Sequence, residues 1–541
     1  MLTWHWASLQ AAGLSLEAES EAGKYRIILA TEFEPVPVRK LHSWTITVRD
    51  ESGTPFIPRQ LAFYGGMPGH GHGLPSEPQV TQQLEEGTYL VEGVLFNMFG
   101  AWELVVGVYG PAGPDKAIFP LTLRPKSVAG ETPPAIGWDA NALALMQSLR
   151  LPQDTRAPLD PTNRFDGRPE AIALGEKLFF DPGLSGTGEI SCASCHLPEL
   201  KFTDGVPTSI GTLQMQRNSP TLLGVAHADW FYWDGRRDSL WAQALTPLET
   251  PGEMDTSRAA AVRYVREHPD YGPAFAGLSN ASAAQTDAEP LPENAGPYGT
   301  PSERAAWSRL SEPQHKRINR AFSDIGKIIA AYVATLQPRD GRFDRFVDAL
   351  AAGKAEAADR LMSASEQAGL RLYLDAAKTQ CLRCHNGPHF TNFGFHNIGT
   401  GMDAQGNRDF GRLFGIRAAQ VDEFNCLGAY SDGTEENCDK HRFGGAGHDA
   451  DGAFKVPGLR NVALTGPYMH DGSLESLGEV LRFYREPPDV ELTGHELPPL
   501  TLTDQELADL EAFLHTLNDS SDAAAVTTPR GVGNPYTAAD E

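Results

Sequence analysis

Several features are scarce in this chain of 541 residues, and each scarcity narrows what the protein can be. Only six cysteines occur, too few for a fold of this length to be built on disulfides. No apolar run approaches the roughly 18 residues that a membrane-spanning helix needs. Basic residues number 45 against 70 acidic ones, so the formal net charge is −25, which disfavours nucleic acids and anionic membranes as partners.

Four of the six cysteines belong to two copies of one short motif. The copies are Cys192-Ala-Ser-Cys195-His196 and Cys381-Leu-Arg-Cys384-His385. In each copy the two thiols can form thioether bonds to haem vinyl groups, and the adjacent histidine can bind the iron. A zinc ribbon also uses Cys-x-x-Cys pairs, but tetrahedral zinc does not require a histidine directly after both second cysteines. The motifs therefore predict two covalently bound haem c groups, with His196 and His385 as iron ligands.

The expected cellular location follows from the haem motifs. Covalent haem attachment normally takes place outside the cytoplasm, so we expect a periplasmic or otherwise exported protein. The first residues, Met1-Leu-Thr-Trp-His-Trp6, lack a basic region followed by an apolar stretch, and no signal peptide is visible. We expect a trimmed or misassigned start, or another export signal. In an oxidising compartment Cys426 and Cys438 could form a disulfide; two free thiols are the alternative.

Hydrophobic patterning divides the chain into an all-β part and a mainly helical part. Ser43-Trp-Thr-Ile-Thr-Val-Arg49 alternates apolar and polar residues, and similar short segments follow it between glycines and prolines, as in a small β-sandwich. The predicted fold class is an N-terminal all-β sandwich followed by two mainly α cytochrome c-type domains. The predicted boundaries are 1–125 for the sandwich, 126–139 for a linker, 140–310 and 311–518 for the cytochrome c domains, and 519–541 for a disordered tail.

A weak internal repeat supports two cytochrome c domains. Gly175-Glu-Lys-Leu-Phe179 precedes the first haem motif, and Gly369-Leu-Arg-Leu-Tyr373 precedes the second. Apolar residues between Ile318 and Leu336 recur at helical spacing, which predicts an amphipathic helix. Thr503-Asp-Gln-Glu506 is a capping box, which predicts a helix that begins at this point.

From about residue 165 to 518 the sequence resembles the bacterial dihaem cytochrome c peroxidase family, including its MauG branch. The blocks that carry the resemblance are Ala171 to Asp181, Arg217-Asn-Ser-Pro-Thr221, Trp233-Asp-Gly-Arg236, Gln243, Pro251-Gly-Glu-Met254, Phe390-Thr-Asn-Phe393, His396-Asn-Ile-Gly399, Phe454-Lys-Val-Pro457, Leu459-Arg-Asn-Val462 and Pro467-Tyr-Met-His470-Asp-Gly472. The resemblance implies that the N-terminal haem reacts with peroxide and that the C-terminal haem stores and passes electrons.

The resemblance also implies roles for three side chains. Glu253 matches the acid above the peroxidatic haem, and Gln243 matches an amide beside it. A carboxylate there can take a proton from bound peroxide and return it to the leaving oxygen. Trp233 matches a tryptophan that lies between the two haems and can relay electrons. The alternatives are an exposed loop acid for Glu253 and a plain core aromatic for Trp233.

Two departures from the ordinary peroxidases concern the sixth ligands of the irons. Many relatives carry a histidine after the first haem motif that caps the resting haem, but the matching segment, 207–212, contains none, which predicts an open first haem. Ordinary relatives place a methionine fourteen residues after the position of His470, where this chain has Tyr484. The MauG branch has a tyrosine there as a ligand, and a phenolate lowers the potential of the iron. Met469 is a competing ligand, and a packed core tyrosine is a further alternative.

Two further metal sites are expected. By resemblance, Asn218 with the carbonyls of Thr465 and Pro467 would hold calcium, which favours oxygen donors; Asn218 could instead cap a turn. The β-domain resembles the small YtkA or FixH-type sandwiches associated with metal handling. It carries a cluster of soft donors that would suit copper, namely Met67, His70, His72 and Met98. A glycine-rich turn with solvated histidines is the alternative.

The predicted function is that of a MauG-type dihaem peroxidase. It would reduce hydrogen peroxide at the first haem and pass oxidising equivalents through the second to a protein or other large substrate. One alternative is an ordinary peroxidase that detoxifies hydrogen peroxide with electrons from a small cytochrome c or cupredoxin. Another is a non-catalytic electron-transfer or copper-handling protein, with both irons saturated.

Overall fold

The computed structural model of the chain describes residues 13–67, 72–97, 100–123, 137–279, 291–402, 407–444, 450–488 and 496–519. The chain forms two compact units. One comprises residues 1–130 together with 439–450, and the other comprises residues 131–438 and 451–541.

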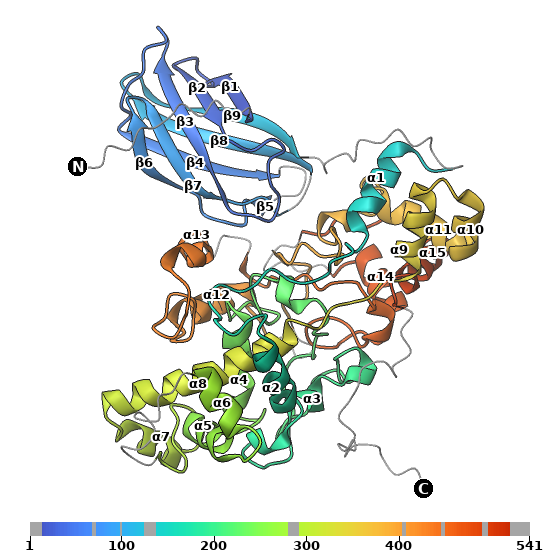
Figure 1. Ribbon diagram of the computed structural model, residues 1–541. Coiled ribbons are helices and arrows are strands. Elements are labelled where there is room, and N and C mark those ends of the chain that lie inside the picture. The colour runs from blue at the N-terminus through green and yellow to red at the C-terminus, as the bar shows by residue number, and fades with distance from the viewer. Residues whose placement is uncertain are drawn as a thin grey trace. The chain divides into compact units, whose positions relative to one another are not determined.

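The first unit is an antiparallel β-sandwich (Figure 1). One sheet has the strand order β1-β2-β3-β7-β6 and the other β5-β4-β8-β9. The strands are β1 (Ser15–Glu19), β2 (Tyr25–Ala30), β3 (His42–Asp50), β4 (Gln60–Met67), β5 (His72–Gly73), β6 (Gln79–Glu85), β7 (Thr88–Val94), β8 (Gly100–Gly110) and β9 (Gly113–Leu123). Alternate residues of β3 and β8, including Trp44 and Trp102, are buried in one core between the sheets. The predicted all-β N-terminal part is confirmed.

A segment from the other end of the chain completes this unit. Helix α13 (Asp439–Phe443) packs on β7, where a side chain at Gly93 would overlap the ring of Phe443. The amide of Glu77 donates a hydrogen bond to the Phe443 carbonyl at 2.7 Å, and Arg442 forms an ion pair with Glu92 at 3.2 Å. The sequence had placed residues 439–450 in the C-terminal cytochrome c domain, whereas the structure groups this segment with the sandwich.

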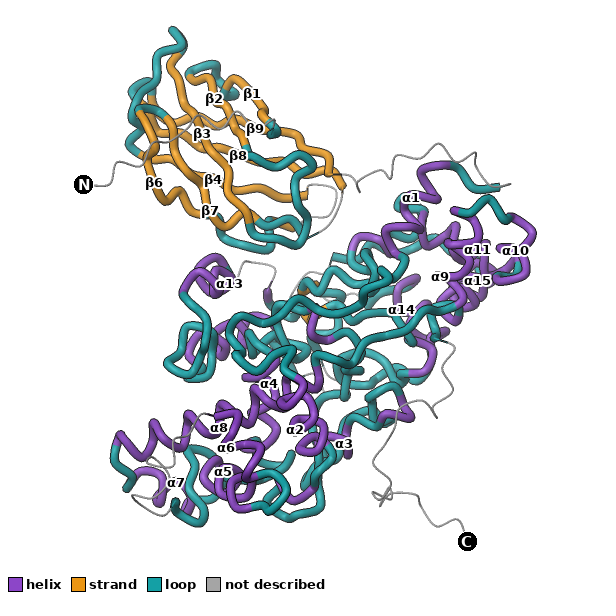
Figure 2. The backbone as a smooth tube through the Cα atoms, in the orientation of Figure 1, coloured by secondary structure: helices purple, strands orange, loops and turns teal. Residues whose placement is uncertain are grey.

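The second unit consists of helices joined by long loops, drawn in purple and teal in Figure 2. Its α-helices are α1 (Ala140–Leu149), α2 (Pro169–Phe179), α3 (Cys192–Cys195), α4 (Leu240–Glu249), α5 (Arg258–Glu267), α6 (Gly272–Ser279), α7 (Pro301–Ser308), α8 (Glu312–Val333), α9 (Arg342–Ala351), α10 (Ala355–Leu361), α11 (Ala364–Leu374), α12 (Arg412–Val421), α14 (Leu477–Arg485) and α15 (Asp504–His515). A short pair of strands, β10 (Phe395–His396) and β11 (Phe454–Lys455), is also present.

The internal repeat corresponds to two similar helix crossings. Gly175 in α2 lies against α8, where a Cβ atom would overlap the carbonyl of Ile328. Gly369 in α11 lies against α15, where a Cβ atom would overlap the carbonyl of Asp509. Each haem motif therefore follows a helix that crosses a later helix at a glycine, because only glycine lets the two backbones approach so closely.

These crossings divide the second unit into two hydrophobic cores whose limits differ from those predicted. Helix α8, expected in the C-terminal domain, buries Ile318, Phe322 and Ile325 in the first core. Helix α1, expected in the N-terminal domain, buries Met146 and Leu149 in the second core. A boundary at 310/311 would therefore place α8 and α2, which cross at Gly175, in different domains.

The predicted end of the second core needs a small correction. Helix α15 begins as expected: the Thr503 amide donates to the Glu506 carboxylate at 2.8 Å, and the Glu506 amide donates to the Thr503 hydroxyl at 3.2 Å. Asp519, placed in the disordered tail, is ordered and pairs with Lys201 at 2.8 Å. The rest of the predicted tail, 520–541, lies outside the described residues.

The loop that joins α12 to α13 contains a disulfide. Cys426 and Cys438 are bonded to each other, which settles the alternative left open by the sequence. The ammonium group of Lys327 in α8 donates hydrogen bonds of 2.6 Å to the Tyr430 carbonyl and to Asp432, so this loop is held against the first core.

A substitution at the second crossing tests this packing. We expect Gly369→Ala to destabilise the holoprotein by about 1–3 kcal/mol, because the new methyl group forces α11 away from α15. Gly277→Ala is a matched control, since nothing lies within 4 Å of a Cβ atom there and alanine favours a helix. The midpoint of chemical denaturation should fall only for Gly369→Ala. Equal midpoints for the two variants would contradict the close crossing.

Candidate haem sites

The first haem motif forms a short helix that presents its histidine in a fixed orientation. Helix α3 spans the two cysteines, and Ser191 caps its N-terminus. The ring of His196 lies 2.9 Å from the carbonyl of Phe202 through Nδ1. A carbonyl can only accept, so Nδ1 carries the proton and Nε2 keeps the lone pair that can bind iron.

The second motif repeats this arrangement. His385 donates through Nδ1 to the carbonyl of Phe390 at 3.1 Å, which again leaves Nε2 free. Both acceptor residues, Phe202 and Phe390, have positive φ angles, 60° and 53°, which are uncommon for a bulky side chain. The Tyr373 hydroxyl donates to the His385 carbonyl and fixes the motif further. Each of these turns directs a carbonyl toward the imidazole. The conformational free energy that the positive φ angle costs therefore serves to orient the histidine ligand.

The residues of both motifs fit haem c. The four thiols form no disulfide and are therefore available for thioether bonds. Burial lowers the pKa of His196, and it lowers that of His385 to about 4. Both imidazoles are thus neutral near pH 7, which is the form that binds iron.

The predicted distal acid lies close to the first motif. Glu253 follows α4, and its carbonyl accepts a hydrogen bond of 3.0 Å from the Thr212 amide. Its carboxylate is close enough to Cys192 and Cys195 to affect their thiols, and no hydrogen bond from a described residue satisfies it. Burial raises the pKa of Glu253, and the positive charge of Arg236 opposes this rise. A buried acid with a raised pKa beside a cofactor site is suited to proton transfer.

Two neighbours of this acid had no role assigned from the sequence. The hydroxyl of Tyr232 donates to the carbonyl of Gln243 at 3.4 Å, and the guanidinium of Arg236 lies 3.5 Å from the centre of the Tyr232 ring. Arg236 also pairs with Asp234 at 3.1 Å. Tyr232 thus contacts the backbone of Gln243. Burial raises the pKa of Tyr232, and the charge of the nearby Glu253 carboxylate raises it further. Only the Trp-Asp-Gly-Arg motif pointed to this region, and it does not specify the stacking.

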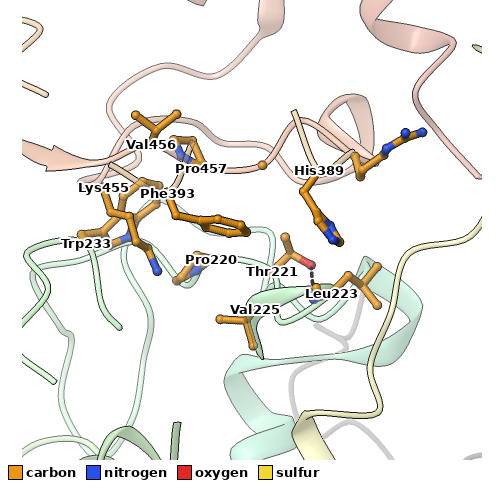
Figure 3. A pocket seen from close by; sticks show the side chains of 13 residues that line it. Pro220, Thr221, Leu223, Val225, Trp233, His389, Phe393, Lys455, Val456 and Pro457 are labelled. Atoms are coloured by element: carbon orange, nitrogen blue, oxygen red, sulfur yellow. Dashed lines mark hydrogen bonds between the residues drawn. The ribbon is translucent and has the colours of Figure 1, made fainter. Parts of the chain in front are cut away.

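Trp233 is buried between segments of the two cores. Its indole Nε1 donates to the Asn218 carbonyl at 2.9 Å, and its own carbonyl accepts from the Lys455 amide at 2.7 Å. It lines a cavity of about 60 Å³ with His389 at the opposite end (Figure 3). That volume suffices for a few water molecules, since about 10–15 Å³ of this measure holds one. The core-aromatic alternative and the relay role are both compatible with this position.

Tyr484 lies beside the second haem motif, as its helical position suggested. It is in the last turn of α14, close enough to Cys381 and Cys384 for their charges to raise its pKa, although burial is the larger cause. Among the described residues, none forms a hydrogen bond with its hydroxyl. This position suits a ligand of the second haem iron. That Tyr484 rather than Met469 is this ligand stays a prediction.

The calcium and copper residues also remain predictions. The amide of Asn218 donates to the Val206 carbonyl at 3.0 Å, and its backbone N–H donates to the His470 carbonyl at 3.0 Å; Thr465 and Pro467 are on the loop before His470. In the sandwich, Met67 is buried in the apolar core. His70, Met98 and the side chain of His72 lie outside the described residues.

The chain is similar in sequence to known dihaem peroxidases. The family model described as "Di-haem cytochrome c peroxidase" matches residues 169–351. The methylamine utilization protein MauG of Methylorubrum extorquens is 31% identical over 365 residues, which are 67% of this chain and 81% of that protein. The cytochrome-c peroxidase IdrP1 of Denitromonas iodatirespirans is 31% identical over 362 residues, 64% of this chain and 81% of that protein. A solved MauG-like protein associated with microbial copper homeostasis is 27% identical, with a TM-score of 0.46, and the match covers 76% of this chain and 98% of that one.

Two haem-attachment motifs, each with an oriented histidine, define a dihaem c-type protein of two cytochrome c-like cores. The chain belongs to the family of dihaem cytochrome c peroxidases that includes MauG, and it is an oxidoreductase of that kind. In the described part of the chain, no helix is both long and apolar enough to cross a membrane.

Proposed function

We propose that this protein is a dihaem peroxidase of the MauG type. It reduces hydrogen peroxide at the haem of His196 and passes oxidising equivalents by way of Trp233 to the haem of His385. Its substrate is a protein or another large molecule that does not reach the iron. The observation that carries the proposal is Tyr484, which lies beside the second haem motif without a hydrogen-bond partner for its hydroxyl in the described structure.

The residues around the first motif support peroxide chemistry. The iron, when present, supplies the binding position for peroxide and accepts its oxidising equivalents. Glu253 takes the proton from the inner peroxide oxygen and returns it to the leaving oxygen, which departs as water. By resemblance Gln243 supplies the distal amide, and the positive charge of Arg236 opposes the effect of burial and so favours the ionised carboxylate of Glu253.

The segment that matches the capping loop of other relatives supports an open resting state. Residues 207–212 contain no histidine, and the segment is tied to the acid loop by hydrogen bonds from the amides of Thr212 and Leu213 to the carbonyls of Glu253 and Gly252, at 3.0 and 2.9 Å. No imidazole on this segment competes with peroxide for the iron.

The proposed setting is the periplasm or another exported location. Haem attachment and the Cys426–Cys438 disulfide both suit an oxidising compartment. The electron donor would be a small cytochrome c or cupredoxin, unless the protein substrate itself supplies the electrons. Calcium near Asn218 belongs to the same proposal.

Stoichiometric hydrogen peroxide added to the fully ferric holoprotein tests the function. We expect prompt loss of both ferric EPR signals and a long-lived change in the optical spectrum, without any added reductant. No reaction until one haem is reduced would instead identify an ordinary, reductively activated peroxidase. Inertness in both states would favour simple electron transfer.

The pH dependence of this reaction should reflect Glu253. Because burial raises its pKa in the folded protein, the carboxylate is lost as the pH falls through a value above the usual 4.3 or so of glutamate. We therefore expect kcat/KM for peroxide to decline on the acid side at a pH above that value. Arg236→Leu should move this decline to higher pH, and Arg236→Lys should move it less. An acid limb that persists unchanged in Glu253→Gln would contradict the assignment.

A further inference from the structure

Three cationic side chains near Trp233 in sequence or space, Arg236, Arg412 and Lys455, all interact with the charge of the same carboxylate, that of Asp234. Arg236 forms an ion pair with Asp234 at 3.1 Å. Lys455 and Arg412 interact with the charge of Asp234 only at longer range. No carboxylate of the described chain lies within ion-pair distance of either one.

Lys455 is in β11, directly beside Trp233 at one end of the cavity (Figure 3). Its ammonium group makes one long hydrogen bond, 3.3 Å to the Trp230 carbonyl. An ammonium group has three donors, so two are unused. Burial lowers the pKa of Lys455 to about 8, which reflects the cost of a charge without a counter-ion.

Arg412 begins α12 and is buried, and it likewise has no counter-ion among the described residues. Its guanidinium lies between the rings of Trp230 and Phe395, at 4.1 and 4.2 Å from their centres, and donates to the Gly235 carbonyl at 3.0 Å. Burial lowers its pKa to about 9. Two aromatic rings lie against this guanidinium, and the N–H groups at its edge that are not bonded to Gly235 can still donate to a partner. The edge of a guanidinium matches the two oxygens of a carboxylate.

A desolvated cation without a counter-ion is costly, and among the described residues neither Lys455 nor Arg412 has one, so both suit a bound anion. The two haem groups of the family each carry two propionate carboxylates. We infer that Lys455, which lies beside Trp233, and Arg412, which lies against Trp230 and Phe395, bind haem propionates. This inference rests on the presence of two haems in this unit and is independent of which substrate the peroxidase oxidises.

Such contacts have a measurable consequence for the irons. A cation near a haem favours the reduced form, which carries one positive charge less. Replacing that cation with a neutral side chain should therefore lower the potential. Because the contact is made by a propionate, the vibrations of that group should change as well.

The test compares the holoproteins of Lys455→Met and Arg412→Gln with wild type. Lys177→Met, at an exposed position of α2, controls for the change in net charge. Spectroelectrochemical titration should show that the reduction equilibrium of at least one haem shifts by about tenfold toward the ferric form, which is about 59 mV for one electron. Resonance Raman spectra should show a displaced propionate bending band. Lys455→Arg should keep the potential and displace the band, since a guanidinium replaces the ammonium in the contact.

Unchanged potentials and propionate bands in both neutral variants would overturn the inference. It would also be overturned if chloride or acetate shifted the potential of wild type and Lys455→Met abolished that shift, because the cation would then serve a free anion. If the neutral variants fail to incorporate haem, the propionate bending band of Lys455→Arg is the deciding measurement. A band at the wild-type position would overturn the inference. Peroxide is absent from all these measurements, so their outcome is separate from that of the proposed function.

Discussion

Replacement of Glu253 with glutamine should slow the reaction of the ferric protein with hydrogen peroxide by about 10²- to 10⁴-fold, the usual contribution of a positioned acid–base group. Glutamine keeps the size of the side chain but cannot take up a proton. The carboxylate is well placed for this task because burial has raised its pKa and because no described residue satisfies it with a hydrogen bond. Stopped-flow measurement of the second-order rate constant with peroxide is the direct assay.

The control for this experiment is another acid near the same haem motif. Glu199 lies in the short helix η2 (Pro198–Leu200), three residues after His196, and its side chain is exposed. Glu199→Gln removes the same charge without touching the acid loop, and its rate should match that of wild type. A Glu253→Gln protein that reacts as fast as wild type would show that the proton goes elsewhere, for example directly to water.

The parts of the structure that the sequence predicted are those that short segments determine. The haem motifs, the capping box at Thr503 and the alternation along β3 each depend on a few neighbouring residues. The glycine that precedes each haem motif marked the internal repeat. The crossing helix, α8 or α15, lies more than a hundred residues further on, so its contact with the glycine could not be read locally.

The two wrong domain limits, at α13 and at 310/311, have the same physical origin: both depend on contacts between distant parts of the chain. Helix α13 is a short, polar segment, and its contacts with Glu77, Glu92 and Gly93, all more than 340 residues earlier in the chain, assign it to the sandwich. The boundary at 310/311 was set by the order of motifs along the chain. The packing of α8 into the first core depends on α2 and α4, which no periodicity within α8 reveals.

The candidate site shows the same division between ligands and their surroundings. The histidine ligands are part of a five-residue motif, so the sequence predicted them. The turns that orient them are not, because Phe202 and Phe390 act through backbone carbonyls and φ angles. The stacking of Arg236 on Tyr232 is likewise a contact between side chains, and the identity of the two residues does not predict it.

Tyr484→Met should have the second large effect, on the potential of the second haem. A thioether favours reduced iron far more than a phenolate does. We expect the potential to rise by about 0.1–0.3 V, a fraction of the roughly 0.8 V that axial ligands span. The ferric protein should then lose the long-lived state after peroxide, because the second haem would no longer hold an oxidising equivalent easily. Potentiometric titration followed by the peroxide experiment measures both effects.

Two further substitutions separate a ligand from a packed tyrosine. Tyr484→Phe removes only the hydroxyl, so in a packing role it would leave the optical spectrum and the potential of the second haem unchanged. Met469→Leu tests the competing ligand on the loop before His470. If Met469→Leu changes the spectrum and neither substitution at Tyr484 does, the ligand is a thioether and the MauG-type proposal fails. The opposite pattern in the optical spectrum would identify Tyr484 as the sixth ligand, because loss of a ligand changes the spin state of the iron, whereas a nearby phenol that does not bind the iron can only tune its potential.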